Sequence, residues 1–221
     1  MPTAPYYVGE GKGRKRVPSV TTITGRFKDS GALIRWANRE GLEGRSMDEA
    51  RDKAADTGSL THDMCFLFMR KEDPYSATMP GLTGEQVLQA HNGFEAFREW
   101  WDDSKIELLD GEMHLVSKKH RYGGTPDVRA RDSKGRICCV DYKTSNTGPY
   151  AEWVIQSAAY CNLFAEHYGD DPQRIHLLKI GKDYGDFHHH SWSKETIDKA
   201  FKVFLHERWL YDELKDLGKL V

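Results

Sequence analysis

The chain has 221 residues, of which 38% are hydrophobic, 11% aromatic and 30% charged. This length predicts one large domain, and the apolar and aromatic content excludes a disordered or fibrous protein. A formal net charge of −2 removes the simplest argument for a nucleic-acid-binding protein, a strongly basic composition. No apolar run reaches transmembrane length, and residues 1–16 lack the charge order of a signal peptide. We therefore expect a cytoplasmic globular protein with no membrane partner.

The near-zero net charge is a sum over unlike segments. Residues 1–40 hold eight basic and three acidic residues, a net charge of +5. Residues 117–136 hold seven basic and two acidic residues, which also gives +5. Such charge runs are often only solvated surface, but two of them could also bind a phosphate backbone.

In the first half of the chain the expected elements are mainly helical. Residues 1–17 form a loop-like basic arm, and Ser30 is placed as the N-cap of a short helix. A second helix is predicted from Ser46, with an interruption at Gly58. Thr83, followed three residues later by a glutamine, forms a capping box that begins a third helix with a long apolar face.

The residue pattern changes from helical to strand-like at residue 105. Three strand-like runs follow, and they predict an antiparallel meander: 106–116, 123–131 and 136–143. A helix is expected over 149–168 and a long amphipathic C-terminal helix over about 193–217, with two more strand-like runs between them, at 174–180 and 186–192.

The last run of the meander carries the most informative residues. Alternation along a strand places Asp141 and Lys143 on one face, and Asp127 lies on the preceding strand of the same hairpin. Two neighbouring carboxylates repel each other, and a divalent cation such as Mg²⁺ would join them, with the Tyr142 carbonyl as a possible further ligand. The competing interpretation is a cross-strand ion pair between Asp127 and Lys143, with Asp141 at a solvated sheet edge.

Four cysteines are scattered along the chain: Cys65, Cys138, Cys139 and Cys161. Cys138 and Cys139 point to opposite faces of their strand, so they cannot jointly hold a cluster in regular geometry. We expect buried, reduced thiols and no iron–sulfur cluster.

A wider motif pattern surrounds the Asp-x-Lys sequence. The segment GGTPDVRARDSKGRICCVDYKTSN, followed by Gln156 and Tyr160, resembles the GxxD, (D/E)xK and QxxxY motifs of RecB-like nucleases of the PD-(D/E)xK superfamily. Upstream, PSVT at 18–21, Trp36 and the GxxxH sequence ending at His62 resemble the mitochondrial genome maintenance exonuclease and its phage-encoded relatives. The resemblance covers roughly residues 17–165.

The resemblance implies a fold and a catalytic set. The fold is an α/β restriction-endonuclease-like domain over residues 1–221, with a central mixed β-sheet flanked by helices. Asp127 and Asp141 would ligate Mg²⁺ or Mn²⁺ with His62, and Lys143 would contact the attacking water. Glu112 matches an acidic position of such nucleases, and its role is left open.

Supporting residues also follow from the resemblance. Gln156 and Tyr160 would contact the DNA backbone or brace Lys143; alternatively, Tyr160 is a core residue. The basic run over 117–136, rather than the resemblance, adds Lys118, Lys119 and Arg121 as residues expected to assist DNA binding. The histidine run 188–190 is not expected to bind metal, because only its first and third members share a strand face.

The implied function is metal-dependent hydrolysis of DNA, by an exonuclease of phage or bacterial recombination, repair or replication. Its partner would be single- or double-stranded DNA, in the cytoplasm of a bacterium or a phage-infected host. Two alternatives stay open. The chain could be a non-cleaving nucleic-acid-binding module of the same fold, or a nuclease subunit of a larger recombination or CRISPR-adaptation-type complex.

Overall fold

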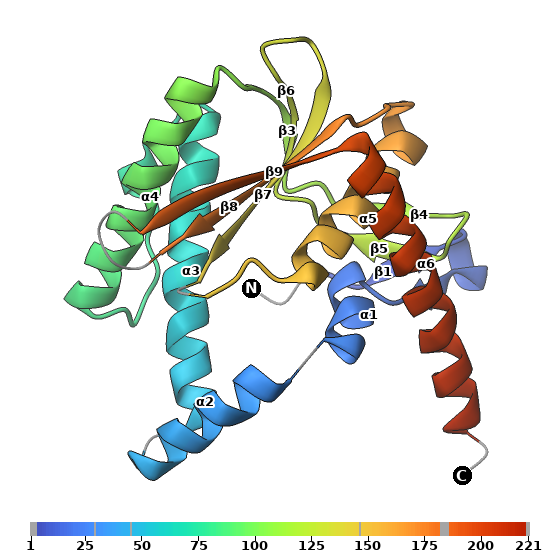
Figure 1. Ribbon diagram of the computed structural model, residues 1–221, viewed down its shortest axis with the longest axis horizontal. Helices are drawn as coiled ribbons and strands as arrows, with labels where there is room; N and C mark the ends of the chain where they lie inside the picture. Colours follow the sequence, from blue (N-terminus) through green and yellow to red (C-terminus); the bar gives the residue numbers. More distant parts are fainter. Residues whose placement is uncertain (1–3, 29, 45, 146, 182–185, 220–221) are drawn as a thin grey trace.

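A computed structural model describes residues 4–28, 30–44, 46–145, 147–181 and 186–219. Its centre is a five-stranded sheet with the strand order β3-β6-β7-β8-β9 (Figure 1). The strands are β3 (Glu107–Gly111), β6 (Val128–Arg131), β7 (Ile137–Thr144), β8 (Arg174–Ile180) and β9 (Phe187–Ser193). β3, β6 and β7 form the predicted antiparallel meander, β8 runs parallel to β7, and β9 runs antiparallel to β8. The expected mixed sheet is therefore confirmed.

Helices cover both faces of the sheet (Figure 1). The helices α3 (Met47–Met69) and α4 (Gly84–Ser104) pack on one face, whereas α5 (Ala151–Tyr168), α6 (Lys194–Leu217) and α1 (Val20–Phe27) share the core of the other. Alternation along β7 divides the two cores, because Val140 and Tyr142 point toward α3 and α4 while Cys139 points toward α5. The α/β class with a helix-flanked mixed sheet is confirmed.

Local sequence signals place several helix starts correctly. At the start of α4, Thr83 Oγ1 accepts from the Gln86 amide at 3.3 Å, and Gln86 Oε1 accepts from the Thr83 amide at 3.0 Å. Ser46 directly precedes α3, and Ser30 precedes α2 (Gly31–Leu42), although Ser30 makes no side-chain capping hydrogen bond. The predicted interruption at Gly58 is wrong, because α3 runs through it without a break.

The N-terminal basic arm is also more ordered than predicted. Residues 6–17 contain a hairpin of β1 (Tyr6–Val8) and β2 (Lys15–Val17), joined by η1 (Gly11–Gly13), and the PSVT segment continues directly into α1. Tyr6 anchors the hairpin, because its buried ring stacks on His114 at 4.2 Å and its hydroxyl lies 2.8 Å from Thr125 Oγ1. The basic composition of the N-terminal arm gave no indication of this buried aromatic contact.

The predicted strand over 106–116 is divided in the structure. β3 ends at Gly111, and β4 (Leu115–Ser117) pairs with β5 (Tyr122–Gly124) in a separate two-stranded sheet. Glu112 lies just past β3 with a φ of 52°, in the left-handed region, which breaks the strand geometry. The remaining short helix, η2 (Pro74–Ser76), lies between α3 and α4. Within the described residues, no helix combines the length and apolar character needed to cross a membrane.

Candidate active site

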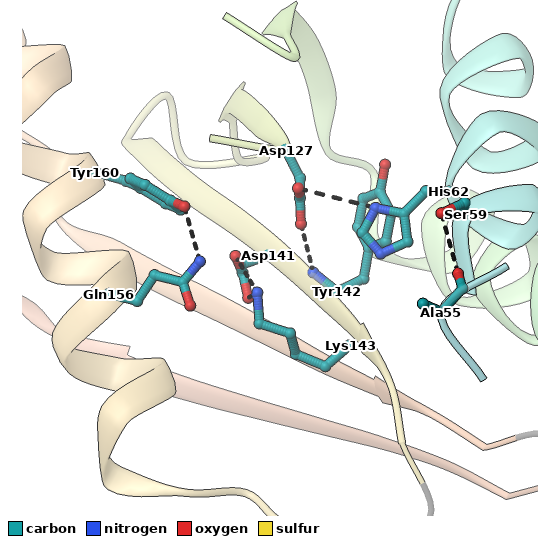
Figure 2. Close-up of polar contacts among 9 residues, drawn as sticks. All are labelled: Ala55, Ser59, His62, Asp127, Asp141, Tyr142, Lys143, Gln156 and Tyr160. Atoms are coloured by element: carbon teal, nitrogen blue, oxygen red, sulfur yellow. Dashed lines mark hydrogen bonds and ion pairs between the residues drawn. The ribbon is translucent and has the colours of Figure 1, made fainter. Parts of the chain in front are cut away.

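The predicted site residues gather around β7, between α3 and α5 (Figure 2). β7 presents Asp141 and Lys143, α3 presents His62, and Asp127 lies in the loop directly before β6. On the opposite side, α5 presents Gln156 and Tyr160. Residues far apart in the sequence are thus brought to one place by the sheet and its two flanking helices.

A buried ion pair forms the centre of this group. Lys143 Nζ donates a hydrogen bond to Asp141 Oδ1 at 2.9 Å and lies 2.7 Å from Oδ2. The Asp141 side chain is 0% exposed, whereas that of Lys143 is 21% exposed. The predicted proximity of the two residues is confirmed. The alternative, in which Lys143 pairs with Asp127 and Asp141 lies at a solvated edge, is wrong. Lys143 pairs with Asp141, β7 is the middle strand of the sheet, and the Asp141 side chain is fully buried.

Asp127 provides a second carboxylate near this pair. Its Oδ2 accepts a hydrogen bond from the Tyr142 amide at 3.1 Å, which fixes the side chain beside β7. Its Oδ1 lies 3.9 Å from His62 Nδ1. The His62 ring packs against the Tyr142 ring at a centroid distance of 4.2 Å. His62 is therefore held in place by β7 as well as by its own helix.

Gly58 explains how α3 approaches β7 so closely. A β carbon at this position would lie 2.5 Å from Thr144 Oγ1, well inside contact distance. Gly58 precedes His62 by one helical turn, so the two residues face the same strand. The GxxxH spacing thus has a physical basis. Gly58 lets α3 pack closely against β7, and this close packing brings His62 to the same strand.

Burial dominates the electrostatics of the carboxylates and the histidine. It raises the pKa of Asp141 to about 6, against the opposing attraction of Lys143, and it also raises the pKa of Asp127. Burial lowers the pKa of His62 to about 4, with Lys143 as the second cause, so the imidazole is neutral near pH 7. A neutral imidazole retains a lone pair for a metal ion.

Lys143 behaves differently from a buried lysine without partners. Burial by itself would lower its pKa, but Asp141 and Asp127 together outweigh burial, and the pKa is raised above its ordinary value. The side chain is therefore an ammonium at neutral pH. It can donate hydrogen bonds and carry positive charge, but it cannot accept a proton as a general base.

The chemical types of these donors suit a hard divalent cation, but the side chains do not form a complete coordination sphere. Asp141 Oδ2 is buried, and its one close polar contact among the described residues is the Lys143 ammonium, 2.7 Å away. Oxygen and imidazole donors of this kind can hold Mg²⁺ or Mn²⁺. In the described part of the chain, however, no three His, Cys, Asp or Glu side chains stand together as a metal-ligand group. A cation would have to compete with the Lys143 ammonium for Asp141.

Two further acidic residues border the site. The Glu112 amide donates to the Asp127 carbonyl at 3.0 Å, which ties the residue to the loop before β6. Partial burial raises the pKa of Glu112, and the charges of Asp63 and Asp127 raise it further. Asp63 was not predicted. One indication of Asp63 was available in the sequence, its position directly after the candidate ligand His62. Consecutive residues of a helix point in different directions, however, so this position did not predict that Asp63 would border the site.

Gln156 and Tyr160 form a pair of their own. Gln156 Nε2 donates to the Tyr160 hydroxyl at 2.7 Å, and the Tyr160 ring is buried against Gly124, where a β carbon would lie 2.6 Å from it. Among the described contacts, neither residue bonds to Lys143. The expected contact with DNA stays a prediction.

The basic segment 117–136 is less available for DNA than its charge suggests. Three of its cations are engaged in ion pairs: Arg129 with Asp170 at 2.6 Å, Arg131 with Glu107 at 3.3 Å and Arg136 with Asp132 at 2.7 Å. The predicted DNA-binding residues Lys118, Lys119 and Arg121 are exposed in the turn between β4 and β5. No described contact joins that turn to the carboxylates of the site.

The cysteines lie as predicted from the sequence, whereas one member of the histidine run has an unpredicted partner. All four cysteines are buried and free, with Cys138 and Cys139 in opposite cores as their alternation predicts. In the 188–190 run, His189 Nε2 lies 2.9 Å from Nδ1 of His176 on β8, a pairing that the sequence did not indicate.

Known proteins offer only a distant comparison. No protein-family model matches the chain, and neither does any curated protein. Solved structures with a similar arrangement include the "Putative exonuclease" of Eubacterium rectale, at 13% identity and a TM-score of 0.41 over 85% of this chain and 69% of that one. They also include the alkaline exonuclease LHK-Exo of Laribacter hongkongensis, at 13% identity and a TM-score of 0.37 over 76% of this chain and 92% of that one. LHK-Exo has also been solved in complex with dAMP. At these values the likeness supports no conclusion about activity.

Proposed function

We propose that this chain is a RecB-like nuclease of the PD-(D/E)xK superfamily that hydrolyses phosphodiester bonds of DNA with Mg²⁺ or Mn²⁺. One observation carries the proposal: the Asp141–Lys143 pair, in which Asp141 is fully buried, lies beside a second and largely buried carboxylate, Asp127, and a neutral histidine, His62. A purely structural ion pair needs neither of these neighbours, and burying a second carboxylate costs free energy unless a cation joins the group.

Each residue would contribute a distinct property. Asp127, Asp141 and His62 would hold the cation, with the Tyr142 carbonyl as a further oxygen donor. A bound Mg²⁺ or Mn²⁺ supplies Lewis-acid activation of water and stabilises charge on a phosphate. Lys143, kept protonated by the two carboxylates, would orient the attacking water and offset the negative charge that develops on the phosphorus centre.

The finer assignments rest on the motif resemblance. It favours an exonuclease that acts on single- or double-stranded DNA in phage or bacterial recombination, repair or replication. A non-cleaving DNA-binding module of the same fold is the second candidate. Lys143 already forms an ion pair with Asp141, and the described residues lack a complete group of metal ligands. A nuclease subunit of a larger complex is the third, and it would retain the same site.

Cleavage assays separate these candidates. Wild type is incubated with linear and circular DNA, single- and double-stranded, in Mg²⁺, Mn²⁺ or EDTA. We expect degradation of linear DNA with either metal, no reaction in EDTA, and resistance of circles. The variant Asp127→Asn should abolish cleavage, whereas Asp186→Asn, which alters an aspartate paired with Lys179, should not. Binding without cleavage in both metals would support the non-cleaving module instead, and cutting of circles would exclude a strict exonuclease.

A further inference from the structure

One long side of α6 is apolar and open to solvent. Val203, Leu210 and Leu217 are 42%, 38% and 58% exposed, whereas Phe204, on another side of the same helix, is fully buried. None of the three exposed residues belongs to either core of the described chain. The second half of α6 extends past the central sheet (Figure 1). The domain therefore uses one side of α6 for its core and leaves a second apolar side uncovered within the described residues.

The exposed residues recur at intervals of seven along α6. Seven residues make almost two turns of helix, so the three side chains lie in one row. At a rise of 1.5 Å per residue, this row is about 21 Å long. A row with this spacing is the pattern by which two helices pack along one another, and it differs from singly scattered exposed residues. We call the row formed by Val203, Leu210 and Leu217 the α6 stripe.

The charges beside the α6 stripe differ between its two ends. Basic residues lie near its first member and acidic residues near its last: Lys199, Lys202, Glu213 and Asp216. Among the described residues, Asp216 pairs with Lys219 past the end of the helix, and the other three make no ion pair. Two copies of α6 in antiparallel orientation would bring the basic end of each to the acidic end of the other, whereas parallel copies would place like charges together. The charge pattern thus fits a second copy of this helix, running in the opposite direction.

The spacing of the α6 stripe fits the same arrangement. Leu210 lies midway between Val203 and Leu217 in the sequence. In an antiparallel pair centred on Leu210, this residue faces its own copy, and Val203 of each chain faces Leu217 of the other. Every member of the stripe then has an apolar partner. Such self-complementarity is what a two-fold symmetric contact requires.

Glu207 is the one acidic residue on the same side of the helix, between Val203 and Leu210. Its Oε2 is buried and has no hydrogen-bond partner among the described residues. Burial raises the pKa of Glu207 to about 7, with the charge of Glu152 on α5 as the second cause. A carboxyl that takes up a proton near neutral pH can be covered by an apolar surface at little desolvation cost.

We propose that the α6 stripe is the contact surface of an antiparallel homodimer. Two helix faces about 21 Å long bury on the order of several hundred Å², which lies at the low end for specific interfaces. We therefore expect a reversible dimer with a Kd in the micromolar range. His62, Asp127, Asp141 and Lys143 all lie outside α6, so the contact uses no residue of the candidate active site. The proposal does not depend on the function proposed above.

The first test compares two neighbouring residues of α6. Leu210→Glu places a carboxylate at the centre of the stripe, whereas Trp209→Glu places the same charge about 100° away around the helix. Both residues are exposed, Trp209 more so, and melting temperatures check that both variants fold. Sedimentation velocity of wild type at about 1 to 300 µM should show a shift from monomer to dimer. Leu210→Glu should raise the Kd more than about 100-fold, and Trp209→Glu should change it less than about threefold.

A charge reversal tests the orientation of the two helices. Lys202→Glu places acid against acid in an antiparallel pair and should raise the Kd about tenfold at low salt. The double variant Lys202→Glu/Glu213→Lys restores opposite charges at both ends and should return the Kd to within about threefold of wild type. In high salt the two variants should converge, because exposed charges are screened. In a parallel pair Lys202→Glu would have no effect, since like charges face each other before and after the change.

Single cysteines test the register, because the native cysteines are all buried. On mild oxidation Leu210→Cys should cross-link to its own copy, whereas Val203→Cys and Leu217→Cys should cross-link only when the two variants are mixed. A monomer at every concentration, a dimer that Leu210→Glu leaves intact, or a charge reversal without effect would overturn the proposal. A dimer formed through α2, where Leu33, Ile34 and Leu42 are also exposed, would give the second of these results.

Discussion

Two lysine–aspartate pairs lie side by side in the central sheet, and only one has the surroundings of a catalytic site. Lys143 on β7 and Lys179 on β8 are register partners on adjacent parallel strands. Lys179 lies 2.9 Å from Asp186, whose side chain is 29% exposed, and Lys143 lies 2.7 Å from Asp141, whose side chain is 0% exposed.

The neighbours of the two pairs differ more than the pairs themselves. Beside Asp141 lie a second carboxylate, Asp127, and the partly buried His62. Beside Asp186 lies His188, 3.3 Å away and largely exposed to solvent. A lysine–aspartate contact is therefore no evidence of catalysis by itself. What distinguishes the β7 pair is a second carboxylate beside a fully buried one, with a single ammonium between them, an excess of negative charge that a divalent cation would relieve.

The largest expected effect comes from removing each lysine in turn. Lys143→Ala should reduce DNA cleavage on the order of 10³-fold, because in the proposed function the ammonium would stabilise charge that develops only in the transition state. Lys179→Ala should leave the rate within about threefold of wild type, although both variants lose thermal stability through a broken ion pair. Initial rates on linear DNA and melting temperatures measure the two effects. Equal rate losses would show that the pairs do not differ in function.

Acid should affect the β7 pair next most strongly. Burial raises the pKa of Asp141 to about 6, so below that pH the carboxyl is protonated and cannot ligate a cation. Mn²⁺ affinity should therefore fall about tenfold per pH unit below pH 6 and level off above pH 7. His62, with a pKa near 4, contributes little in this range. Calorimetric Mn²⁺ titrations from pH 5 to 8 check this, and a pH-independent affinity would contradict the assignment of Asp141 as a ligand.

In the metal-free protein the same pKa predicts the opposite dependence for stability. The folded state holds a proton on Asp141 between its ordinary pKa and about 6, where the unfolded chain has released it. The contribution of this group to the free energy of unfolding is therefore present at low pH and is lost as the pH rises through 6. Urea unfolding in EDTA at pH 5 and pH 7, with Asp141→Asn as the control, measures the difference.

A smaller effect is expected from the two glycines that let a helix approach each pair. A β carbon on Gly58 would lie 2.5 Å from Thr144 on β7, and one on Gly93 of α4 would lie 2.8 Å from Ile180 on β8. Each change to alanine adds overpacking of about 1 to 3 kcal/mol, which a gain of about 1 kcal/mol in helix propensity partly offsets. Gly58→Ala should also lower cleavage about tenfold by displacing His62, whereas Gly93→Ala should not.

A second substitution tests the mechanism of the Gly58 effect. Thr144→Ala removes the hydroxyl oxygen that the new methyl group would meet, so Gly58→Ala/Thr144→Ala should recover most of the activity. Cleavage rates of the single and double variants are compared at saturating Mg²⁺. Failure of the double variant to recover would mean that Gly58 acts by some route other than its close approach to β7.

Local sequence patterns were sufficient to predict features that depend on contacts within a single helix or strand. The capping box fixed the start of α4. The period of two along β7 placed Asp141 and Lys143 on one face of the strand and Val140 and Tyr142 on the other. These are contacts between residues a few positions apart, whose geometry the backbone dictates. The same reasoning failed at Gly58 and at the N-terminal arm, where a distant strand supplies the deciding contact.

The sequence by itself predicted the meander and the proximity of Asp127, Asp141 and Lys143, because strand alternation and turn chemistry are local. The α/β class and the candidate catalytic set followed from the motif resemblance. Only the tertiary structure decided that Asp141 is fully buried, that His62 reaches β7 through the space left by Gly58, and that Arg129 is neutralised by Asp170. Burial and ion pairing depend on which segments pack against one another, and packing sums over residues far apart in the chain. The pKa of a carboxylate, and hence its chemistry, is set by that packing.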